Sequence, residues 1–337
     1  MSENSPVRFG VIGCGHIGKR HAAMITNNSH CELLALCDIA PQNELRIDEY
    51  KVPFYNNIDQ FLKEPFDVLC IATPNGLHEE HALKGLRAGK HVVIEKPMAL
   101  SKAGCERIIF EALHYHKQVF CIMQNRYSPP SKWLKSIISE GKLGKIYMVQ
   151  INCYWNRDER YYKKGNWHGT KKLDGGTLFT QFSHFIDILY WLFGDIQNIS
   201  SRLNVFNHQQ LTEFEDSGFI SFELVSGGMG NFNFSTSSWD TNLESSLTII
   251  AEHGTVKVGG QYMNKVEYCH IKDYVMPELP PSNPPNDYGP YKGSAANHHY
   301  VFENIVDVLK GRGPIDTNAL EGLKVVEIIE KMYAGGN

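Results

Sequence analysis

A glycine-rich loop between an apolar strand and a helix is the feature that most constrains how this chain folds. Residues 7–12 predict a short buried strand, and Gly13, Gly15 and Gly18 follow it in the spacing G-x-G-x-x-G before a helical stretch. Such glycines let backbone N–H groups of the loop and of the helix N-terminus approach a pyrophosphate. Asp38 lies twenty positions beyond Gly18, directly after a second predicted strand. Its carboxylate can accept hydrogen bonds from ribose hydroxyls and would repel a 2′-phosphate, so the pattern predicts a dinucleotide site that prefers NAD over NADP.

Further apolar runs alternate with helical segments along the first third of the chain. They lie at residues 33–37, 67–72, 91–94 and 119–123. This alternation predicts βαβ units and a parallel sheet that helices cover on both faces. We therefore expect an α/β chain whose first domain, residues 1–122, is a Rossmann-type, doubly wound parallel sheet that binds NAD.

The pattern changes near residue 123, where strands with alternating apolar and polar side chains begin, as in residues 147–155. Alternation of this kind is typical of an antiparallel sheet with one buried face. We expect a second, α+β domain over residues 123–337, with an open, mainly antiparallel sheet that binds substrate and forms oligomers. Its last helices can pack back on the first domain.

Two helices are expected within the second domain. Ser128 and Pro129 predict a helix start in which Ser128 is the N-cap. Another helix is predicted over residues 177–193, where Thr180 and His184 are four residues apart and would share one helix face. This spacing alone leaves open whether His184 is functional or structural.

Lys96 lies between Glu95 and Pro97 at the end of the apolar run 91–94. Open α/β sheets bind ligands outside the carboxyl ends of their strands, so this lysine is expected beside the dinucleotide. Burial can bring the pKa of a lysine towards neutrality, where it serves as an acid or base. The alternative is an ordinary surface lysine after a strand, but the neighbouring glutamate and proline would fix the backbone, which favours catalysis.

Other histidines give weaker signals. His78 and His81 are three residues apart, unlike the pair in H-E-x-x-H, and the sequence places no third ligand, so no metal site is expected. His78 is instead expected to approach the dinucleotide from the loop that begins with Thr73. His298 opens a predicted helix, where it could face an anion or be solvated.

The segment of residues 156–172 is the best clue to a substrate. It carries six basic and two acidic residues, a local balance of +4 in a chain with a net charge of −4. Tyr161, Tyr162 and Trp167 are interleaved with these charges. Aromatic faces stack on sugars or bases, and guanidinium groups bind phosphate or carboxylate. A solvated charged loop and a contact with single-stranded nucleic acid are the alternatives.

Composition narrows the class of protein. Hydrophobic residues make up 42% and charged residues 21% of the 337, the profile of a soluble globular protein with room for two domains. The net charge of −4 and a pI near 6.4 argue against nucleic acid as the main partner. We see neither an apolar run long enough for a membrane span nor a secretory signal. Eight cysteines without a C-x-x-C motif fit reduced thiols, so a cytoplasmic location is expected.

These motifs together resemble the glucose–fructose oxidoreductase/inositol dehydrogenase (Gfo/Idh/MocA) family over residues 7–333. The resemblance rests on the glycine loop, Thr73-Pro74-Asn75 with His78, Glu95-Lys96-Pro97, and the glycine pair that leads to His184 and Asp187. It implies a Rossmann domain followed by an open sheet domain through which the family often assembles, here as a homodimer or homotetramer. It also implies that Lys96 and His184 flank the substrate carbon beside the nicotinamide.

Within this family, several stretches resemble the UDP-N-acetylglucosaminuronic acid 3-dehydrogenases, among them Gln124-Asn125-Arg126 and Asp174-Gly175-Gly176. Such enzymes oxidise the sugar C3 hydroxyl to a ketone, ahead of transamination, in the synthesis of surface polysaccharides. The resemblance implies a nucleotide-sugar substrate, with Lys96 as the base and His184 polarising the same oxygen. Thr180 departs from the family, where aspartate or asparagine is usual, and His168 stands where arginine is expected.

The motifs and the resemblance together define the expected site. Cofactor contacts are expected from Gly13, Gly15, His16, Ile17, Gly18, Asp38, Thr73, Pro74, Asn75, His78, Glu95, Lys96, Gln124 and Trp167. Substrate contacts are expected from Lys96, Arg126, Tyr154, Arg157, Arg160, Tyr161, Thr180, Gln181, His184 and His298.

Two alternatives stay open at this point. An inositol or free-sugar dehydrogenase of the same family would share Lys96 and His184 but would have no need of a pyrophosphate clamp. A non-catalytic, NAD-sensing regulator could use the same fold, although the presence of both residues counts against it. The sequence also leaves open which sugar is oxidised, whether NADH is released or reoxidised in place, and whether the proline-rich loop 277–290 reaches a neighbouring subunit.

Overall fold

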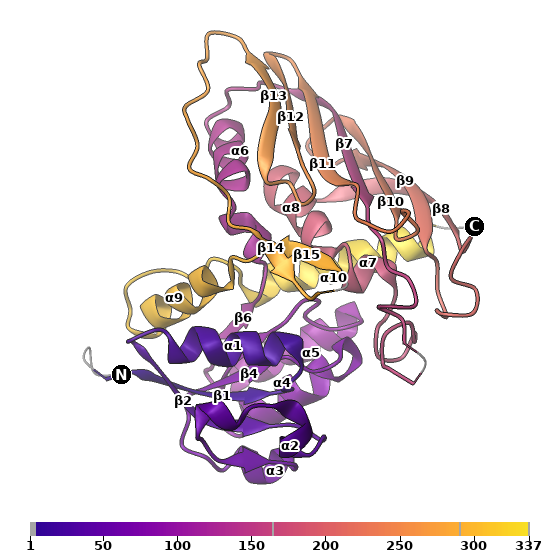
Figure 1. Ribbon diagram of the computed structural model, residues 1–337. Helices are drawn as coiled ribbons and strands as arrows, with labels where there is room; N and C mark the ends of the chain where they lie inside the picture. The colour runs from indigo at the N-terminus through magenta and orange to yellow at the C-terminus, as the bar shows by residue number, and fades with distance from the viewer. Residues whose placement is uncertain (1–4, 164, 290, 336–337) are drawn as a thin grey trace. The chain divides into compact units, whose positions relative to one another are not determined.

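The computed structural model describes residues 5–163, 165–289 and 291–335, and the chain divides into two compact units (Figure 1). The first unit comprises the chain up to Met123 together with His298–Val326, and the second comprises Gln124–Asn297 together with the residues from Glu327 onward. Lys164 of the basic segment and Pro290 of the proline-rich loop lie outside the described residues. No helix in the described part of the chain is both long enough and apolar enough to cross a bilayer.

Six parallel strands form the sheet of the first unit, in the order β3-β2-β1-β4-β5-β6. They are β1 (Val7–Ile12), β2 (Cys31–Cys37), β3 (Phe54–Tyr55), β4 (Val68–Ile71), β5 (His91–Ile94) and β6 (Val119–Cys121). The predicted doubly wound parallel sheet is therefore confirmed. The strand order reverses direction between β1 and β4, which is where open sheets of this order bind ligands.

Helices connect these strands and complete the core of the first unit. They are α1 (His16–Thr26), α2 (Gln42–Leu45), α3 (Ile58–Phe61), α4 (His78–Arg87), α5 (Lys102–His114) and α9 (His298–Leu309), with short 3₁₀ turns η1 (Asp48–Tyr50) and η2 (Asn75–Leu77). Ser101 caps α5, because its hydroxyl accepts a hydrogen bond from the Gly104 N–H at 3.0 Å. Phe302 of α9 packs edge-on against Phe9 of β1, with ring centroids 5.8 Å apart. The helix α9 therefore belongs to the core around β1.

Seven strands form the main sheet of the second unit, in the order β13-β12-β11-β7-β10-β9-β8. They are β7 (Ile146–Tyr154), β8 (Ile196–Asn204), β9 (Ser217–Leu224), β10 (Met229–Ser235), β11 (Glu244–Ala251), β12 (Gly254–Gly259) and β13 (Lys265–Ile271). Strands β7 and β10 pair in parallel and the other neighbours are antiparallel, so the predicted mainly antiparallel sheet is confirmed. A small hairpin of β14 (Pro285–Asp287) and β15 (Lys292–Ala295) forms within the region of the proline-rich loop.

One face of this sheet is buried and the other is exposed. Along β9, Ile220 and Phe222 are buried whereas Phe219 is exposed, as the alternating pattern predicts. The buried face meets α8 (Ser183–Phe193) and the residue before it, since the Phe182 ring lies 5.6 Å from Phe234 of β10. Aromatic side chains therefore anchor the start of α8 on the sheet.

The helix α6 (Pro129–Ser139) begins where the sequence predicts, but the side chain of its N-cap residue does not bond the helix. Pro129 occupies the first helical position, whereas the Ser128 hydroxyl makes no bond to the helix. This hydroxyl accepts a hydrogen bond from the Asn297 amide instead, at 3.0 Å. Ser128 is therefore the N-cap residue, as predicted, but its hydroxyl does not bond the helix, because a residue distant in sequence competes for the same oxygen.

The helix expected over residues 177–193 is interrupted. The structure has α7 (Thr177–Thr180), a break at Gln181 and Phe182, and then α8. The Phe182 N–H bonds the Thr177 carbonyl at 3.3 Å, one residue beyond the α-helical spacing. Thr180 and His184 consequently do not share the face of one continuous helix, and that prediction is wrong.

A tyrosine near the end of α10 (Ala319–Ala334) ties that helix to the loop before α7 within the second unit. The Tyr333 hydroxyl donates to the Glu215 carboxylate at 2.7 Å and accepts from the Leu178 N–H at 3.2 Å. Gly176 has a φ of +137°, and a Cβ there would lie 2.2 Å from the Tyr333 hydroxyl. The second member of the predicted glycine pair is thus required both by its backbone conformation and by this contact.

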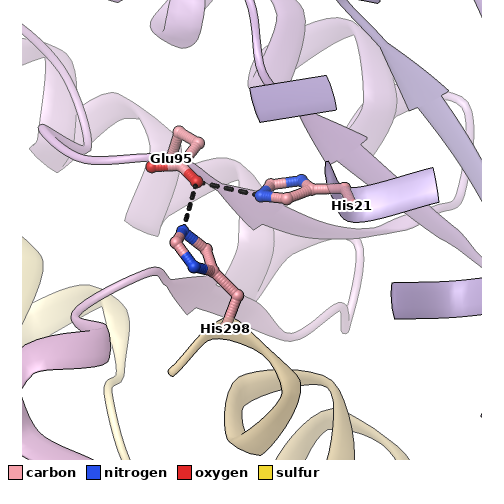
Figure 2. A group of neighbouring side chains, drawn as sticks. All are labelled: His21, Glu95 and His298. Atoms are coloured by element: carbon pink, nitrogen blue, oxygen red, sulfur yellow. Dashed lines mark hydrogen bonds and ion pairs between the residues drawn. The ribbon is translucent and has the colours of Figure 1, made fainter. Parts of the chain in front are cut away.

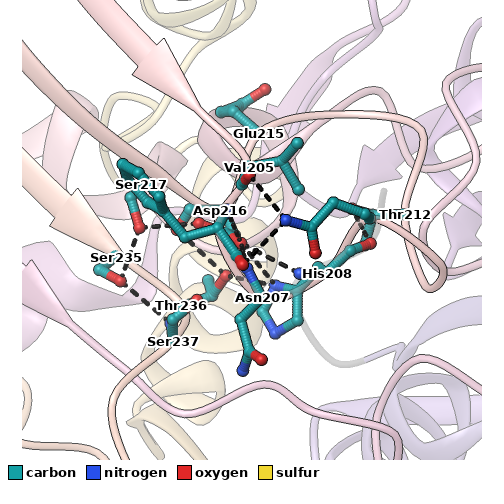
Figure 3. Close-up of polar contacts among 12 residues, drawn as sticks. Val205, Asn207, His208, Thr212, Glu215, Asp216, Ser217, Ser235, Thr236 and Ser237 are labelled. Atoms are coloured by element: carbon teal, nitrogen blue, oxygen red, sulfur yellow. Dashed lines mark hydrogen bonds and ion pairs between the residues drawn. The ribbon is translucent and has the colours of Figure 1, made fainter.

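The loop between β8 and β9 folds around a buried carboxylate (Figure 3). Asp216 is fully buried, and its Oδ2 accepts backbone N–H bonds from Phe206, Asn207 and His208 at 2.7–3.2 Å. Its Oδ1 accepts from the Ser217 hydroxyl at 2.8 Å. One side chain therefore satisfies several otherwise unpaired donors of the loop next to Glu215.

Glu215 should make the stability of the second unit depend on pH. Burial raises the pKa of Glu215 from 4.5 to about 7, against the opposing effect of its bond from Tyr333. A raised folded-state pKa stabilises the fold below the unfolded-state pKa, and this contribution is lost as the pH rises through 7. Each pKa unit corresponds to about 1.4 kcal/mol.

We expect Glu215→Gln, which cannot ionise, to gain thermal stability over the wild type as the pH rises from 5 to 8. The measurement is the Tm of both proteins across that range, with the exposed Glu223→Gln on β9 as the matched control. A difference in Tm between Glu215→Gln and the wild type that stays constant across this pH range would contradict the raised pKa of Glu215.

Candidate functional site

The glycine loop after β1 has the geometry of a ligand cradle. Gly13 has a φ of +88°, and a Cβ there would lie 2.5 Å from the Ala72 carbonyl oxygen. A Cβ on Gly18 would lie 1.6 Å from the Gly13 carbonyl oxygen. A Cβ on Gly15 would meet nothing within 4 Å. Two glycines are therefore required by backbone contacts, and the third leaves the exposed start of α1, at His16 and Ile17, open to a ligand.

Asp38 directly follows β2 and is tied to this loop. Its Oδ2 accepts the Cys14 N–H at 2.6 Å, and its Oδ1 accepts the Ala40 N–H at 2.9 Å. Each carboxylate oxygen keeps a further lone pair, and the side chain is only partly buried. These two bonds hold the carboxylate beside the glycine loop. These residues fit a dinucleotide.

The loop after β4 is organised by His78. This histidine is fully buried, with Nε2 at 2.8 Å from the Thr73 carbonyl and Nδ1 at 2.7 Å from the Pro97 carbonyl. Burial lowers the pKa of His78, and a neutral ring, which carries a hydrogen on only one nitrogen, donates to one of these two carbonyls at a time. The ring links the loops after β4 and β5, and its nitrogens do not face a cofactor as the sequence suggested. Pro74 is partly exposed and Asn75 is buried.

Lys96 lies where the sequence predicts, just beyond the carboxyl end of β5. Its side chain is partly buried, its N–H donates to the carboxylate of Glu95 at 3.2 Å, and its peptide bond to Pro97 is cis. Because β5 neighbours β4 in the sheet, the lysine loop and the Thr73 loop lie at the same edge as the glycine loop. The first unit thus gathers its predicted cofactor residues at one edge.

His184 stands in the first turn of α8, in the second unit, and is 3% exposed. Its Nε2 lies 3.1 Å from the Gln124 amide nitrogen. The amide can only donate, so Nε2 is the acceptor and the neutral ring carries its proton on Nδ1. Gln124, predicted as a cofactor contact, therefore sets the tautomer of His184.

Arg126 and Asp187 form a buried ion pair one turn further along α8. The guanidinium bonds both carboxylate oxygens, at 2.8 and 2.5 Å, and the two side chains are 5% and 1% exposed. Such a bidentate pair neutralises the charge of Arg126. The prediction that Arg126 binds substrate is not supported by this geometry, because the cation fixes α8 instead.

Arg157 is also buried, but its acceptors are neutral. It donates to Gln181 Oε1 at 2.8 Å and to Asn242 Oδ1 at 3.2 Å, and is 2% exposed. The guanidinium lies 4.8–5.4 Å from the rings of Trp155, Tyr161 and Tyr291. Burial lowers the pKa of Arg157, and these aromatic faces partly replace its hydration. Gln181, at the break before α8, is held by this cation.

The rest of the basic segment is folded rather than solvated. Tyr161 and Tyr162 belong to a buried cluster with Phe214, and Arg160 pairs with Asp158 and Asp240. Trp167 stacks on His168 at 3.7 Å. Tertiary contacts that the sequence does not reveal occupy these aromatic faces and Arg160. The structure therefore does not leave them free to contact substrate, contrary to the prediction from the sequence. The lysines at 163, 171 and 172 remain exposed.

Three more predicted substrate residues lie next to polar partners of their own. The Thr180 hydroxyl donates to the carboxylate and, at 3.0 Å, to the carbonyl of Asp174, which sequence reasoning did not place at the site. Asp174 is 1% exposed and also accepts the Gly169 N–H at 2.7 Å. His298, in the first unit, is 1% exposed and faces Glu95. Tyr154 on β7 is partly exposed, with its hydroxyl 3.3 Å from Asn152.

Known sequence families match most of the chain. The profile described as "Oxidoreductase family, NAD-binding Rossmann fold" matches residues 7–122, and the profile described as "GFO/IDH/MocA C-terminal domain" matches residues 132–257. The first match confirms the NAD-binding fold predicted from the glycine loop and Asp38.

Solved structures and a known relative extend these matches. The WlbA dehydrogenase from Bordetella pertussis, crystallised with NADH and UDP-GlcNAcA, is 29% identical, has a TM-score of 0.87, and covers 98% of this chain and 96% of its own. The WlbA dehydrogenase from Chromobacterium violaceum, in complex with the same two ligands, is 28% identical with a TM-score of 0.89, over 99% of this chain and 94% of its own. Glucose-6-phosphate 3-dehydrogenase of Bacillus subtilis is 26% identical over 83% of each chain.

Asp38→Ser should narrow the preference for NAD over NADP. The variant removes the charge that repels a 2′-phosphate and weakens the bonds to the ribose hydroxyls. Since a hydrogen bond to a charged group contributes about 1.5–3 kcal/mol, the ratio of the two dissociation constants should shift by at least tenfold. The measurement is calorimetric titration with each dinucleotide, with Asp59→Ser on α3 as an equal change of charge elsewhere in the unit. An unchanged ratio would refute the role of Asp38.

Proposed function

This chain belongs to the Gfo/Idh/MocA family of NAD-dependent oxidoreductases, and from that membership we propose that it oxidises the C3 hydroxyl of UDP-N-acetylglucosaminuronic acid to a ketone. The observation that carries the proposal is the likeness, over nearly the whole chain, to two dehydrogenases crystallised with NADH and UDP-GlcNAcA. At 28–29% identity the likeness supports the substrate without fixing it. The product would serve the synthesis of a surface polysaccharide.

Each step of the oxidation is assigned to a group of this chain. The glycine loop and Asp38 would hold NAD, which supplies the acceptor for the hydride that leaves C3 with its electron pair. Lys96 would remove the hydroxyl proton, because it stands at the sheet edge that also carries the glycine loop. His184, with its tautomer set by Gln124, would bind and polarise the same oxygen. One C–H and one O–H bond break, and the carbonyl forms.

Only some of the cations in the basic segment support an anionic substrate. Within the segment, Arg160 is paired with carboxylates and Arg157 is buried, which leaves the lysines at 163, 171 and 172 as exposed cations with no such role among the described residues. We assign these lysines, rather than the arginines, to the diphosphate. Buried Arg157 has only neutral acceptors, which suits a neighbouring carboxylate of the substrate.

Assembly and location belong to the same proposal. Large apolar side chains are exposed on the sheet of the second unit, among them Tyr147, Phe219, Met229 and Tyr268. Such patches mark interaction surfaces, so we propose a homodimer or homotetramer formed through this sheet. None of the eight cysteines forms a disulfide, and most are buried, which fits the reducing environment of the cytoplasm.

The test is a panel of substrates with NADH formation as the readout. We expect the wild type to use UDP-N-acetylglucosaminuronic acid with kcat/KM at least roughly tenfold above UDP-N-acetylglucosamine, since loss of one charge-assisted contact costs about 1.5–3 kcal/mol. Glucose 6-phosphate and myo-inositol should be poorer still. Lys96→Ala should keep NAD binding and lose at least roughly a hundredfold in kcat, the scale of general-base assistance.

Two results would overturn the proposal in different ways. Efficient oxidation of myo-inositol or glucose 6-phosphate, with no binding of UDP, would make the chain a free-sugar or sugar-phosphate dehydrogenase, as the relative from Bacillus subtilis is. Binding of NAD without its reduction by any member of the panel would favour a regulator on this fold.

A further inference from the structure

Glu95, beside Lys96, is the centre of a buried polar cluster in the first unit (Figure 2). Its carboxylate is almost inaccessible, and Oε1 lies 2.9 Å from His21 Nε2 and 3.6 Å from His298 Nε2. Its other oxygen, Oε2, accepts the N–H of Lys96 at 3.2 Å. His21 comes from α1, Glu95 from the end of β5, and His298 from the first turn of α9. The cluster therefore joins the helix behind the glycine loop to the loop of the lysine.

The contacts identify the charge state of this cluster. Burial opposes ionisation of Glu95, but its contacts with His21 and His298 hold the pKa of the carboxyl well below its usual range. Burial lowers the pKa of His298, so its ring is neutral. The arrangement is a buried carboxylate that accepts one hydrogen bond from His21 Nε2 and one from the backbone N–H of Lys96, while His298 Nε2 lies 3.6 Å away, beyond hydrogen-bond distance. Both donors depend on the negative charge of Glu95.

A metal ion is the obvious alternative, because these three side chains could each offer one ligand atom. Histidines that bind metals almost always donate their other ring nitrogen to a carbonyl, carboxylate or water. Among the described residues, neither His21 Nδ1 nor His298 Nδ1 has such a protein partner. The 2.9 Å separation of His21 Nε2 and Glu95 is that of a direct hydrogen bond. The cluster is a hydrogen-bonded unit rather than a metal site.

We propose that Glu95 is a positioning residue for Lys96, and that the bond from His21 orients its carboxylate so that the lysine stands correctly for proton transfer. This inference rests on the proposed function, since it requires Lys96 to act as the base. A displacement of about 1 Å in a reacting group can cost roughly a hundredfold in rate, even when nothing at the reacting centre is changed. A fixed backbone at Lys96 is therefore a condition for catalysis.

The first test is Glu95→Gln, alone and in the Lys96→Ala background. Glutamine keeps the volume but has one acceptor oxygen where the carboxylate has two, so at least one buried donor loses its partner. We expect kcat to fall by roughly tenfold to a hundredfold, with KM for the sugar and the Kd of NAD changing little. Because Glu95 acts through Lys96, adding Glu95→Gln to Lys96→Ala should lower kcat no further.

The second test uses pairs of substitutions that keep or remove a donor. His21→Gln can still present an N–H to the carboxylate, whereas His21→Leu cannot, so the first should retain most of the kcat that the second loses. Val93→Ala on β5 is the control for lost packing, because Val93 is fully buried and apolar. It should lower the Tm while leaving kcat near that of the wild type.

The outcomes separate this inference from the proposed function. Full turnover by Lys96→Ala would show that Lys96 is not the base, and it would therefore overturn both the proposed role of Lys96 and the positioning role of Glu95. Loss of turnover in Lys96→Ala with normal kcat in Glu95→Gln would overturn the positioning role alone, as would an additive effect of Glu95→Gln in the Lys96→Ala background. Stoichiometric zinc in the purified wild type that disappears in His21→Leu would show that the cluster is a metal site and would also overturn it.

Discussion

Close backbone contact at two glycines is the constraint on which the cofactor edge depends. Gly13 and Gly18 have no room for a side chain, because the turn after β1 lies against Ala72 and against itself. Only this tight turn brings the start of α1 to the point where the strand order reverses. Asp38 accepts the Cys14 N–H, so a hydrogen bond links the loops that follow β1 and β2. The loop that carries Lys96, after β5, lies at the same edge because β5 runs parallel to β4 and β1.

Carboxylates organise the polar residues of the second unit in a comparable way. Asp187 neutralises Arg126, Asp174 accepts from Thr180, and Asp216 satisfies the N–H groups of a loop. An unpaired charge in such a place would cost several kcal/mol, so these pairs restrict which cations stay available to a ligand. Under the proposed function, substrate recognition would therefore fall to a few groups, chiefly the exposed lysines and Arg157. His184 is held in one tautomer by the same kind of local bond, from Gln124.

The sequence predicted most of the first unit because its signals are local. The strand 91–94 and the start of α1 follow directly from apolar runs and glycine spacing. The family resemblance, and with it the NAD-binding fold and the mainly antiparallel second sheet, is confirmed. The break before α8 could not be predicted, since the groups that hold it, Asp174 and Arg157, act through tertiary contacts. Tertiary contacts also explain why the side-chain roles of Ser128 and His78 could not be predicted. The Ser128 hydroxyl accepts from Asn297, and the His78 ring nitrogens lie against two backbone carbonyls.

The most direct test of the central claim follows one hydrogen atom. UDP-N-acetylglucosaminuronic acid carrying deuterium at C3 would be incubated with the enzyme and NAD, and the NADH analysed by mass spectrometry. The account predicts that the deuterium appears in NADH, one label for each 3-keto sugar formed, and that the reaction is slowed by a primary isotope effect. Unlabelled NADH with the deuterium retained in the sugar would show that the hydride comes from another carbon and would contradict the account.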